Sequence, residues 1–232
     1  MKKSTPIEIA NKIQNLFGNI VSEKPAVYET KPKAEKEICF LSEELTPAEM
    51  IAIGNYQDVH PWNDQKLDWS FEIPEHWKEK AYCYVINSCC RSLLFYEMMT
   101  KVEQELIDFN LLNLDSAIEK GRIIRDIFLV RGVKNKDWLP EGHTIGTKYL
   151  EEAYGSFSLN MDVALQYTNM RDPILFRLCT TSKMKALRVD DSEFEIIRPR
   201  KTKYIIINIS KEFVQIGENK FIEVTFYDIM EA

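Results

Sequence analysis

The sequence predicts an α+β protein in which helices come first and strands follow. Apolar residues recur at helical spacing as far as about residue 110, whereas short runs rich in Ile, Val, Phe and Tyr occupy the chain from residue 126 onward. No internal repeat or low-complexity segment interrupts this order. Because the two patterns are segregated along the chain, they indicate an α+β fold and not alternating βαβ units.

Composition places the chain among ordinary globular proteins. Of its 232 residues, 45% are hydrophobic and 28% are charged, which excludes wholesale disorder. Against 36 aspartates and glutamates there are 30 lysines and arginines, and the resulting net charge of −6 argues against a general nucleic-acid binder. A local basic site for a small anion is compatible with this balance. The length favours one large domain, with or without a small appendage.

The sequence gives little support for metal or disulfide chemistry. The five cysteines form no CxxC pair and their number is odd, so we expect reduced, mostly buried thiols. His60, His76 and His143 have no metal-ligand spacing. The N-terminal residues lack the apolar stretch of a signal peptide, and no run of about 18 apolar residues occurs. We therefore expect no membrane span, synthesis in the cytoplasm, and any secretion or injection to proceed without a cleaved signal.

Residues 1–45 are predicted to be an N-terminal appendage. Apolar residues at helical spacing between Ile9 and Ile20 predict a short amphipathic helix, and we expect it to pack on the main domain rather than dock a partner. The polar, proline-containing stretch 22–37 is typical of a linker.

Helices are predicted next along the chain. The segment 46–49 (TPAE) has the pattern of a capping box, in which a threonine and a glutamate three residues later satisfy each other's backbone N–H groups, so a helix begins there. Helical stripes run from Pro74 to about residue 110. A further short helix is expected from Asp115 to Lys120, ended by Gly121.

Strands are predicted throughout the second half, from its β-branched and aromatic residues. The segments are 126–133, 153–160, 173–180, 185–190, 193–199, 203–209 and 221–229. A short helix capped by Asn160 separates the second segment from the third.

Arg131 is the first candidate for a functional residue. It follows directly after the apolar run 126–130 and precedes Gly132. A charged side chain at the edge of a core strand needs a partner that offsets its charge. The glycine would let a ligand approach the backbone closely. Taken alone, the simpler interpretation is an arginine that pairs with a carboxylate.

Two triplets place polar side chains on one face of a strand. In Ser156-Phe157-Ser158, alternation sends both hydroxyls to one face and Phe157 to the other. In Glu193-Phe194-Glu195, alternation places both carboxylates on one face and Phe194 in the core. Two carboxylates this close raise the pKa of one of them, unless a cation, a hydrogen-bond donor or a substrate offsets their charge. Each triplet is also compatible with an ordinary solvated strand. No Ser-His-Asp set, P-loop or GxGxxG motif offers an alternative chemistry.

The order of these three signals resembles the Arg–Ser–Glu signature of toxin-like mono-ADP-ribosyltransferases, which include clostridial binary-toxin and C3-like exoenzymes and phage-encoded transferases. The resemblance covers roughly residues 45–228, and is carried by 45–57, 114–133, 154–176 and 192–206. It departs from the family at Phe157, where threonine is usual, although that position faces the core. The resemblance implies an ADP-ribosyltransferase-like fold, with a helical N-terminal half packed on a mixed two-sheet β core, and a catalytic domain spanning 46–232.

The resemblance also implies how NAD binds. Arg131 is similar to the arginine that grips the NAD phosphates and holds the cleft, and Arg171, in the loop before Pro173, is similar to the second phosphate-gripping arginine. Gly132 would place backbone groups against the nicotinamide amide. NAD would be a substrate, and no metal is implied.

Catalysis, by the same resemblance, depends on the two triplets. Ser156 would hydrogen-bond and orient Glu195, the catalytic glutamate, and Glu193 would select arginine as the acceptor. The implied activity is transfer of ADP-ribose from NAD to arginine on a target protein, as a toxin or effector. The alternatives are an NAD glycohydrolase on the same fold, for which Glu193 is dispensable, and a catalytically silent binding module.

Overall fold

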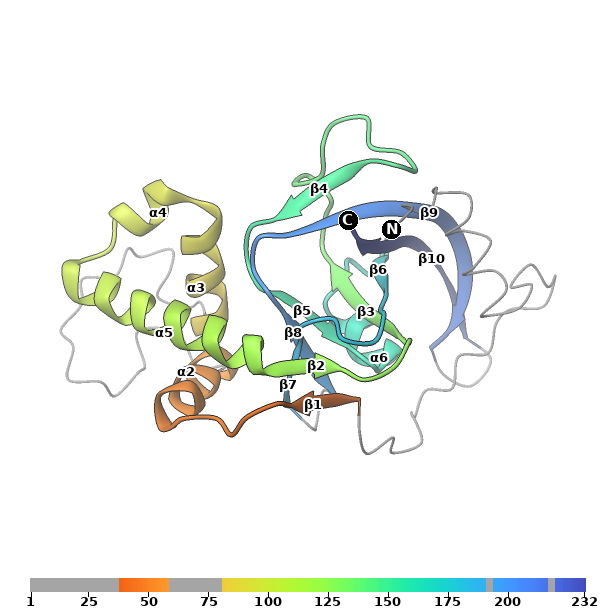
Figure 1. The fold of residues 1–232 in the computed structure, drawn as a ribbon. Coiled ribbons are helices and arrows are strands. Elements are labelled where there is room, and N and C mark those ends of the chain that lie inside the picture. The colour runs from red at the N-terminus through yellow and green to blue at the C-terminus, as the bar shows by residue number, and fades with distance from the viewer. Residues whose placement is uncertain (1–37, 59–80, 191–193, 217–219) are drawn as a thin grey trace.

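The protein consists of a group of helices and a strongly curved β-sheet that lie side by side (Figure 1). The computed structural model describes residues 38–58, 81–190, 194–216 and 220–232. The helix predicted between Ile9 and Ile20 and the linker 22–37 lie outside these residues. Within the described ranges, no helix is both long enough and apolar enough to cross a membrane. The α+β class is confirmed.

The helical lobe precedes most of the strands. It comprises α2 (Pro47–Gln57), α3 (Tyr82–Arg91), α4 (Leu93–Glu97) and α5 (Lys101–Lys120). The capping box predicted for α2 is confirmed, because the N–H of Glu49 donates to Thr46 Oγ1 at 3.2 Å and the N–H of Thr46 donates to Glu49 Oε2 at 2.7 Å.

Two polar residues divide the long helical stripe into separate helices. The hydroxyl of Ser92 caps α4 by accepting from the N–H of Phe95, and Thr100 caps α5 in a second capping box with Glu103. The separate helix predicted from Asp115 is wrong, because α5 runs unbroken through that position and its buried side chains continue on both sides of it. The predicted end at Gly121 is confirmed.

The strands form two sheets. β1 (Cys39–Leu41) pairs with β2 (Gly121–Ile123), and eight strands form a mixed sheet in the order β4-β9-β10-β6-β3-β5-β8-β7. Only the β10–β6 pair is parallel among the described strand pairs of that sheet. The bounds are β3 Phe128–Val133, β4 Lys148–Glu151, β5 Gly155–Ser158, β6 Ile174–Cys179, β7 Leu187–Asp190, β8 Glu195–Arg198, β9 Thr202–Gln215 and β10 Phe221–Glu231.

Each predicted strand segment overlaps one of these strands, although β9 and β10 extend beyond their predicted segments, and the sequence missed β1, β2 and β4. The missed strands have three or four residues, too few for an alternating pattern to stand out. The pairing of β1 with β2 and the burial of Ile38 show that the end of the predicted appendage takes part in the fold.

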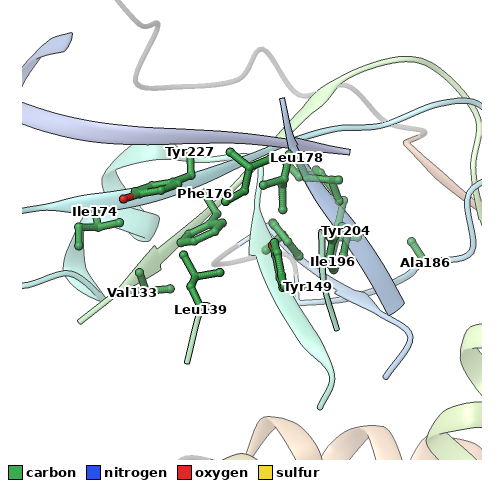
Figure 2. Close-up of a cluster of buried hydrophobic side chains, with 14 of the residues drawn as sticks. Val133, Leu139, Tyr149, Ile174, Phe176, Leu178, Ala186, Ile196, Tyr204 and Tyr227 are labelled. Atoms are coloured by element: carbon green, nitrogen blue, oxygen red, sulfur yellow. The ribbon is translucent and has the colours of Figure 1, made fainter. Parts of the chain in front are cut away.

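Three apolar cores hold the molecule together. The first joins the helical lobe to the β5, β7 and β8 region of the sheet through Tyr154, Leu187 and Ile197. The second lies among the curved strands, where Phe176 stacks on Tyr227 with ring centroids 5.1 Å apart (Figure 2). The third lies between the short helix α6 (Met161–Gln166) and strands β3, β6, β9 and β10. Asn160 caps α6 as predicted, accepting from the N–H of Asp162.

Candidate active site

Three neighbouring strands carry Arg131, Ser156 and Glu195. Arg131 lies on β3 and Ser156 on β5, and Glu195 is the first residue of β8, while the strand order places β5 between the other two. Val130 lies opposite Ser158, and Ser158 lies opposite Glu195. The sheet therefore assembles in one region three residues that are far apart in the sequence.

Ser156 and Glu195 are in direct contact. The Ser156 hydroxyl donates to Glu195 Oε1, and both side chains are half-buried. Both side chains lie on one side of the antiparallel β5–β8 pair, where the residue directly opposite Glu195 is Ser158, two positions after Ser156. Phe157 points to the opposite side and is 3% exposed. The predicted division of this triplet between the two faces of the strand is confirmed.

The backbone before Glu195 differs from the prediction. Phe194 has a φ of 52°, in the left-handed region that non-glycine residues rarely adopt, and β8 begins only at Glu195. A left-handed residue breaks the alternation of a strand, so the prediction of Phe194 as a core strand residue is wrong, and its side chain is only half-buried. Glu193 lies outside the described residues. The turn places Glu195 at the very start of its strand.

Arg131 has a carboxylate partner. Its Nη1 lies 2.7 Å from Glu151 Oε2, and its guanidinium lies 5.9 Å from the centre of the Phe157 ring. Burial would lower the pKa of Arg131, but the charge of Glu151 and the hydrogen bond to it raise that pKa. The same carboxylate binds Arg91 of α3, with Nη2 3.1 Å from Glu151 Oε1. Glu151 therefore pairs with two arginines from different parts of the fold.

Tyr56 of α2 is a buried tyrosine whose pKa responds to charged groups of the candidate site. Its buried hydroxyl accepts a hydrogen bond from Asn87 Nδ2 at 2.9 Å. Burial raises the pKa of Tyr56, which Glu195 raises further, while Asn87 and Arg131 lower it. The Tyr56 hydroxyl is therefore within electrostatic range of both Glu195 and Arg131.

A pocket of about 530 Å³ opens beside Arg131. It is lined by Arg91, Arg131, Gly132, Val133, Lys134, Asn135, Trp138, Leu150, Glu151, Glu152 and Tyr167. Three of these side chains are cationic and two are anionic, so the lining favours an anion although the whole protein is acidic. Trp138, Leu150 and Tyr167 add exposed apolar surface to the lining.

Gly132 has a packing role as well as a place in the pocket lining. A Cβ atom at this position would lie 1.9 Å from the carbonyl oxygen of Ala164 in α6. Only glycine therefore allows α6 to approach β3 this closely.

Arg171, the second predicted phosphate-binding arginine, lies apart from this pocket lining. It is exposed in the loop between α6 and β6, where its backbone N–H donates to Asn169 Oδ1 at 3.1 Å. Of the predicted site residues, the structure thus brings Ser156 and Glu195 into contact, places Arg131 on the adjoining strand β3, and places Arg171 at the surface.

Sequence reasoning missed Arg91 and Glu151. A signal for Glu151 was present in KYLE (148–151), because alternation puts its side chain on the same side as Tyr149, and an inward carboxylate next to a candidate arginine strand needs a cation. No comparable signal marked Arg91, which lies at the end of α3. Among the described residues, no group of His, Cys, Asp and Glu gathers to hold a metal ion.

The fold of the chain is that of ADP-ribosyltransferase toxins. It is similar to the ADP-ribosylating toxin BECa of a binary enterotoxin of C. perfringens, solved with NADH, with a TM-score of 0.54 and 16% identity over 82% of this chain and 45% of BECa. For the enzymatic component C2-I of the C2-toxin from Clostridium botulinum the TM-score is 0.52, with 13% identity over 81% of this chain and 44% of C2-I. The Clostridium limosum C3 exoenzyme gives 0.51, with 16% identity over 82% of this chain and 87% of the exoenzyme.

These similarities concern the fold, since the identities are low. The chain spans less than half the length of BECa and C2-I. No protein-family model matches the sequence, and no curated protein matches it.

Proposed function

We propose that the protein is a mono-ADP-ribosyltransferase that cleaves the nicotinamide–ribose bond of NAD and transfers ADP-ribose to arginine side chains of a target protein, as a toxin or effector. The observation that carries this proposal is the hydrogen bond from Ser156 to Glu195. Arg131 lies on the strand next to that of Ser156 and lines a pocket with more cationic than anionic side chains. The fold shared with ADP-ribosyltransferase toxins supports it.

Glu195 would act on the ribose. Cleavage of the ribose–nicotinamide bond generates an oxocarbenium-like centre, and a carboxylate beside that centre stabilises its positive charge, as in glycoside hydrolysis. Ser156 holds the carboxylate by one oxygen, Oε1, so the carboxylate does not need to reorient as charge develops. The step breaks the C–N glycosidic bond, and nicotinamide leaves with the bonding electrons.

The pocket would take the pyrophosphate of NAD. Arg131 and Arg91 both line it, and guanidinium groups suit phosphate oxygens because their planar donors bind two oxygens at once. The exposed Arg171 and the backbone at Gly132 are further contacts for the dinucleotide in this proposal, as the sequence resemblance implies.

The acceptor would be recognised by Glu193, two residues before the catalytic glutamate. An arginine side chain is always protonated and therefore a poor nucleophile. A carboxylate at position 193 would bind and orient this guanidinium, and accept its proton as the new N–C bond forms. This role separates the proposed transfer from simple hydrolysis of NAD.

Two variants test the proposal. We expect Glu195→Gln, which keeps the size of the side chain but removes its charge, to abolish nicotinamide release from NAD. We expect Glu193→Ala to abolish transfer of label from NAD to protein while some hydrolysis remains. The label on a lysate protein should be removed by hydroxylamine, as for an arginine linkage. Full turnover by Glu195→Gln would overturn the catalytic assignment, and transfer by Glu193→Ala at the wild-type rate would overturn the acceptor assignment.

A further inference from the structure

A single buried carboxylate joins the two arginines that line the pocket. Glu151 is 4% exposed, and its Oε2 binds Arg131 Nη1 at 2.7 Å while its Oε1 binds Arg91 Nη2 at 3.1 Å. Arg131 belongs to β3, Arg91 to the last turn of α3 and Glu151 to β4. The three side chains therefore connect the helical lobe with two strands that are not neighbours in the sheet.

Charge explains why the three groups stay together. Burial alone would raise the pKa of Glu151, but the charges of Arg131 and Arg91, with their hydrogen bonds, lower it, so the carboxylate is ionised at neutral pH. Two guanidinium groups facing one pocket repel each other, and the carboxylate between them offsets one of the two charges. Arg91 is 45% exposed, so without this partner its side chain would be free to turn into water.

The carboxylate is also held firmly in place. β4 pairs with β9, with Glu151 opposite Thr202, and the N–H of Ala153 donates to Glu151 Oε1 at 3.4 Å. One nitrogen of each guanidinium is engaged by Glu151, and no other hydrogen-bond acceptor contacts either group within the described chain. Each arginine thus keeps N–H donors for a ligand in the pocket.

We propose that Glu151 is a positioning residue, which joins Arg91 and Arg131 into one anion-binding pair for the pyrophosphate of the dinucleotide. The inference rests on the function proposed above. It assigns to Glu151 no contact with the reacting atoms, and it predicts that the residue acts on substrate affinity rather than on the chemical step.

Binding of ADP-ribose, measured by calorimetry, tests this role without turnover. We expect Glu151→Gln to weaken ADP-ribose binding about tenfold or more, the loss expected when charge-assisted hydrogen bonds are removed. KM for NAD should rise by a similar factor while kcat changes by less than about threefold, because the lost interaction serves ground state and transition state alike. Since Glu151 acts in part through Arg91, its effect should be smaller in an Arg91→Ala background, where only its ion pair with Arg131 remains.

Glu49→Gln is the matched control. Glu49 is also buried, at 2% exposed, and also pairs with a cation, Lys120 at 2.7 Å, but it lies in α2 and does not line the pocket. We expect this variant to lower stability and leave ADP-ribose binding unchanged. A general loss of stability is thereby separated from loss of the arginine pair.

The outcomes distinguish this inference from the proposed function. If the wild-type protein neither binds ADP-ribose nor releases nicotinamide, the proposed function fails and this inference fails with it. If the wild type is active but Glu151→Gln binds ADP-ribose as tightly as the wild type, only the positioning role fails. Tighter binding by Glu151→Gln would also overturn it, because Glu151 would then be a competitor of the phosphate.

Discussion

Ser156 holds Glu195 through one hydroxyl, and this contact can be removed without changing any charge. We expect Ser156→Ala to lower kcat for nicotinamide release about tenfold to hundredfold, because the hydrogen bond from residue 156 that orients the carboxylate is lost. KM for NAD should change little, since Ser156 is not part of the pocket lining. Steady-state kinetics of nicotinamide release measure both quantities. Ser156→Thr, which keeps the hydroxyl, should retain more activity than the alanine variant, and equal losses in both would contradict the hydrogen-bonding role.

Two glycines provide a matched test of packing between β3 and α6. We expect Gly132→Ala to destabilise the fold by about 1–3 kcal/mol or more, because its methyl group would overlap the Ala164 carbonyl. Gly54 lies inside α2, and no atom would lie within 4 Å of a Cβ added there. There, alanine should raise stability by roughly 0.5–1 kcal/mol. Chemical unfolding compares the two, and a Gly132→Ala protein as stable as the wild type would show that α6 can move away from β3.

Helix α2 begins with a titratable contact. Burial would raise the pKa of Glu49, but hydrogen bonds from Lys120, Ser116 and Thr46 outweigh it and lower the pKa from 4.5 to about 2. The folded state therefore binds this proton less readily than the unfolded state. The resulting stability is present above pH 4.5 and is lost as the pH falls toward 2.

The lowered pKa of Glu49 predicts that the stability difference between the wild type and Glu49→Gln depends on pH. We expect the free energy of unfolding of the wild type to exceed that of Glu49→Gln above pH 4.5, and the difference to shrink toward pH 2. Urea unfolding across this range measures it. Glu119→Gln is the control, since Glu119 is 57% exposed and its ion pair with Lys185 is a surface pair that adds little to stability. A difference that stays constant with pH would contradict the assignment.

At the scale of elements, the sequence predicted what alternation and capping determine locally. The capping box, the strand around Ser156 and the inward Phe157 follow from side-chain type and spacing, and all were predicted. The left-handed Phe194 was not, because any residue except glycine is a poor marker of positive φ. The continuity of α5 was also missed, since Asp115 is favoured at helix starts but here lies within the helix and binds Arg200 at 2.7 Å.

At the scale of the whole molecule, the order of the Arg, Ser and Glu strands predicted the fold, although each signal alone was ambiguous. The link from Arg131 through Glu151 to Arg91 lay beyond sequence reasoning, because it depends on how the sheet curves and on where the helical lobe docks. Arg91 ends a helix, where a basic residue is ordinary, and only its distance of 3.1 Å to Glu151 identifies it as part of the candidate site.

Strand β10 follows every other described strand in the chain, yet it lies between β9 and β6 in the sheet order. While the polypeptide is being synthesised, β4 and β9 can therefore pair with each other but have no hydrogen-bonded connection to β6, β3 and β5 until residues 221–231 leave the ribosome. Joining the two halves is a late, long-range folding step. Strand β4, which carries Glu151, takes its final place in the sheet only when β10 has paired with both β9 and β6, so the candidate pocket is completed late in folding.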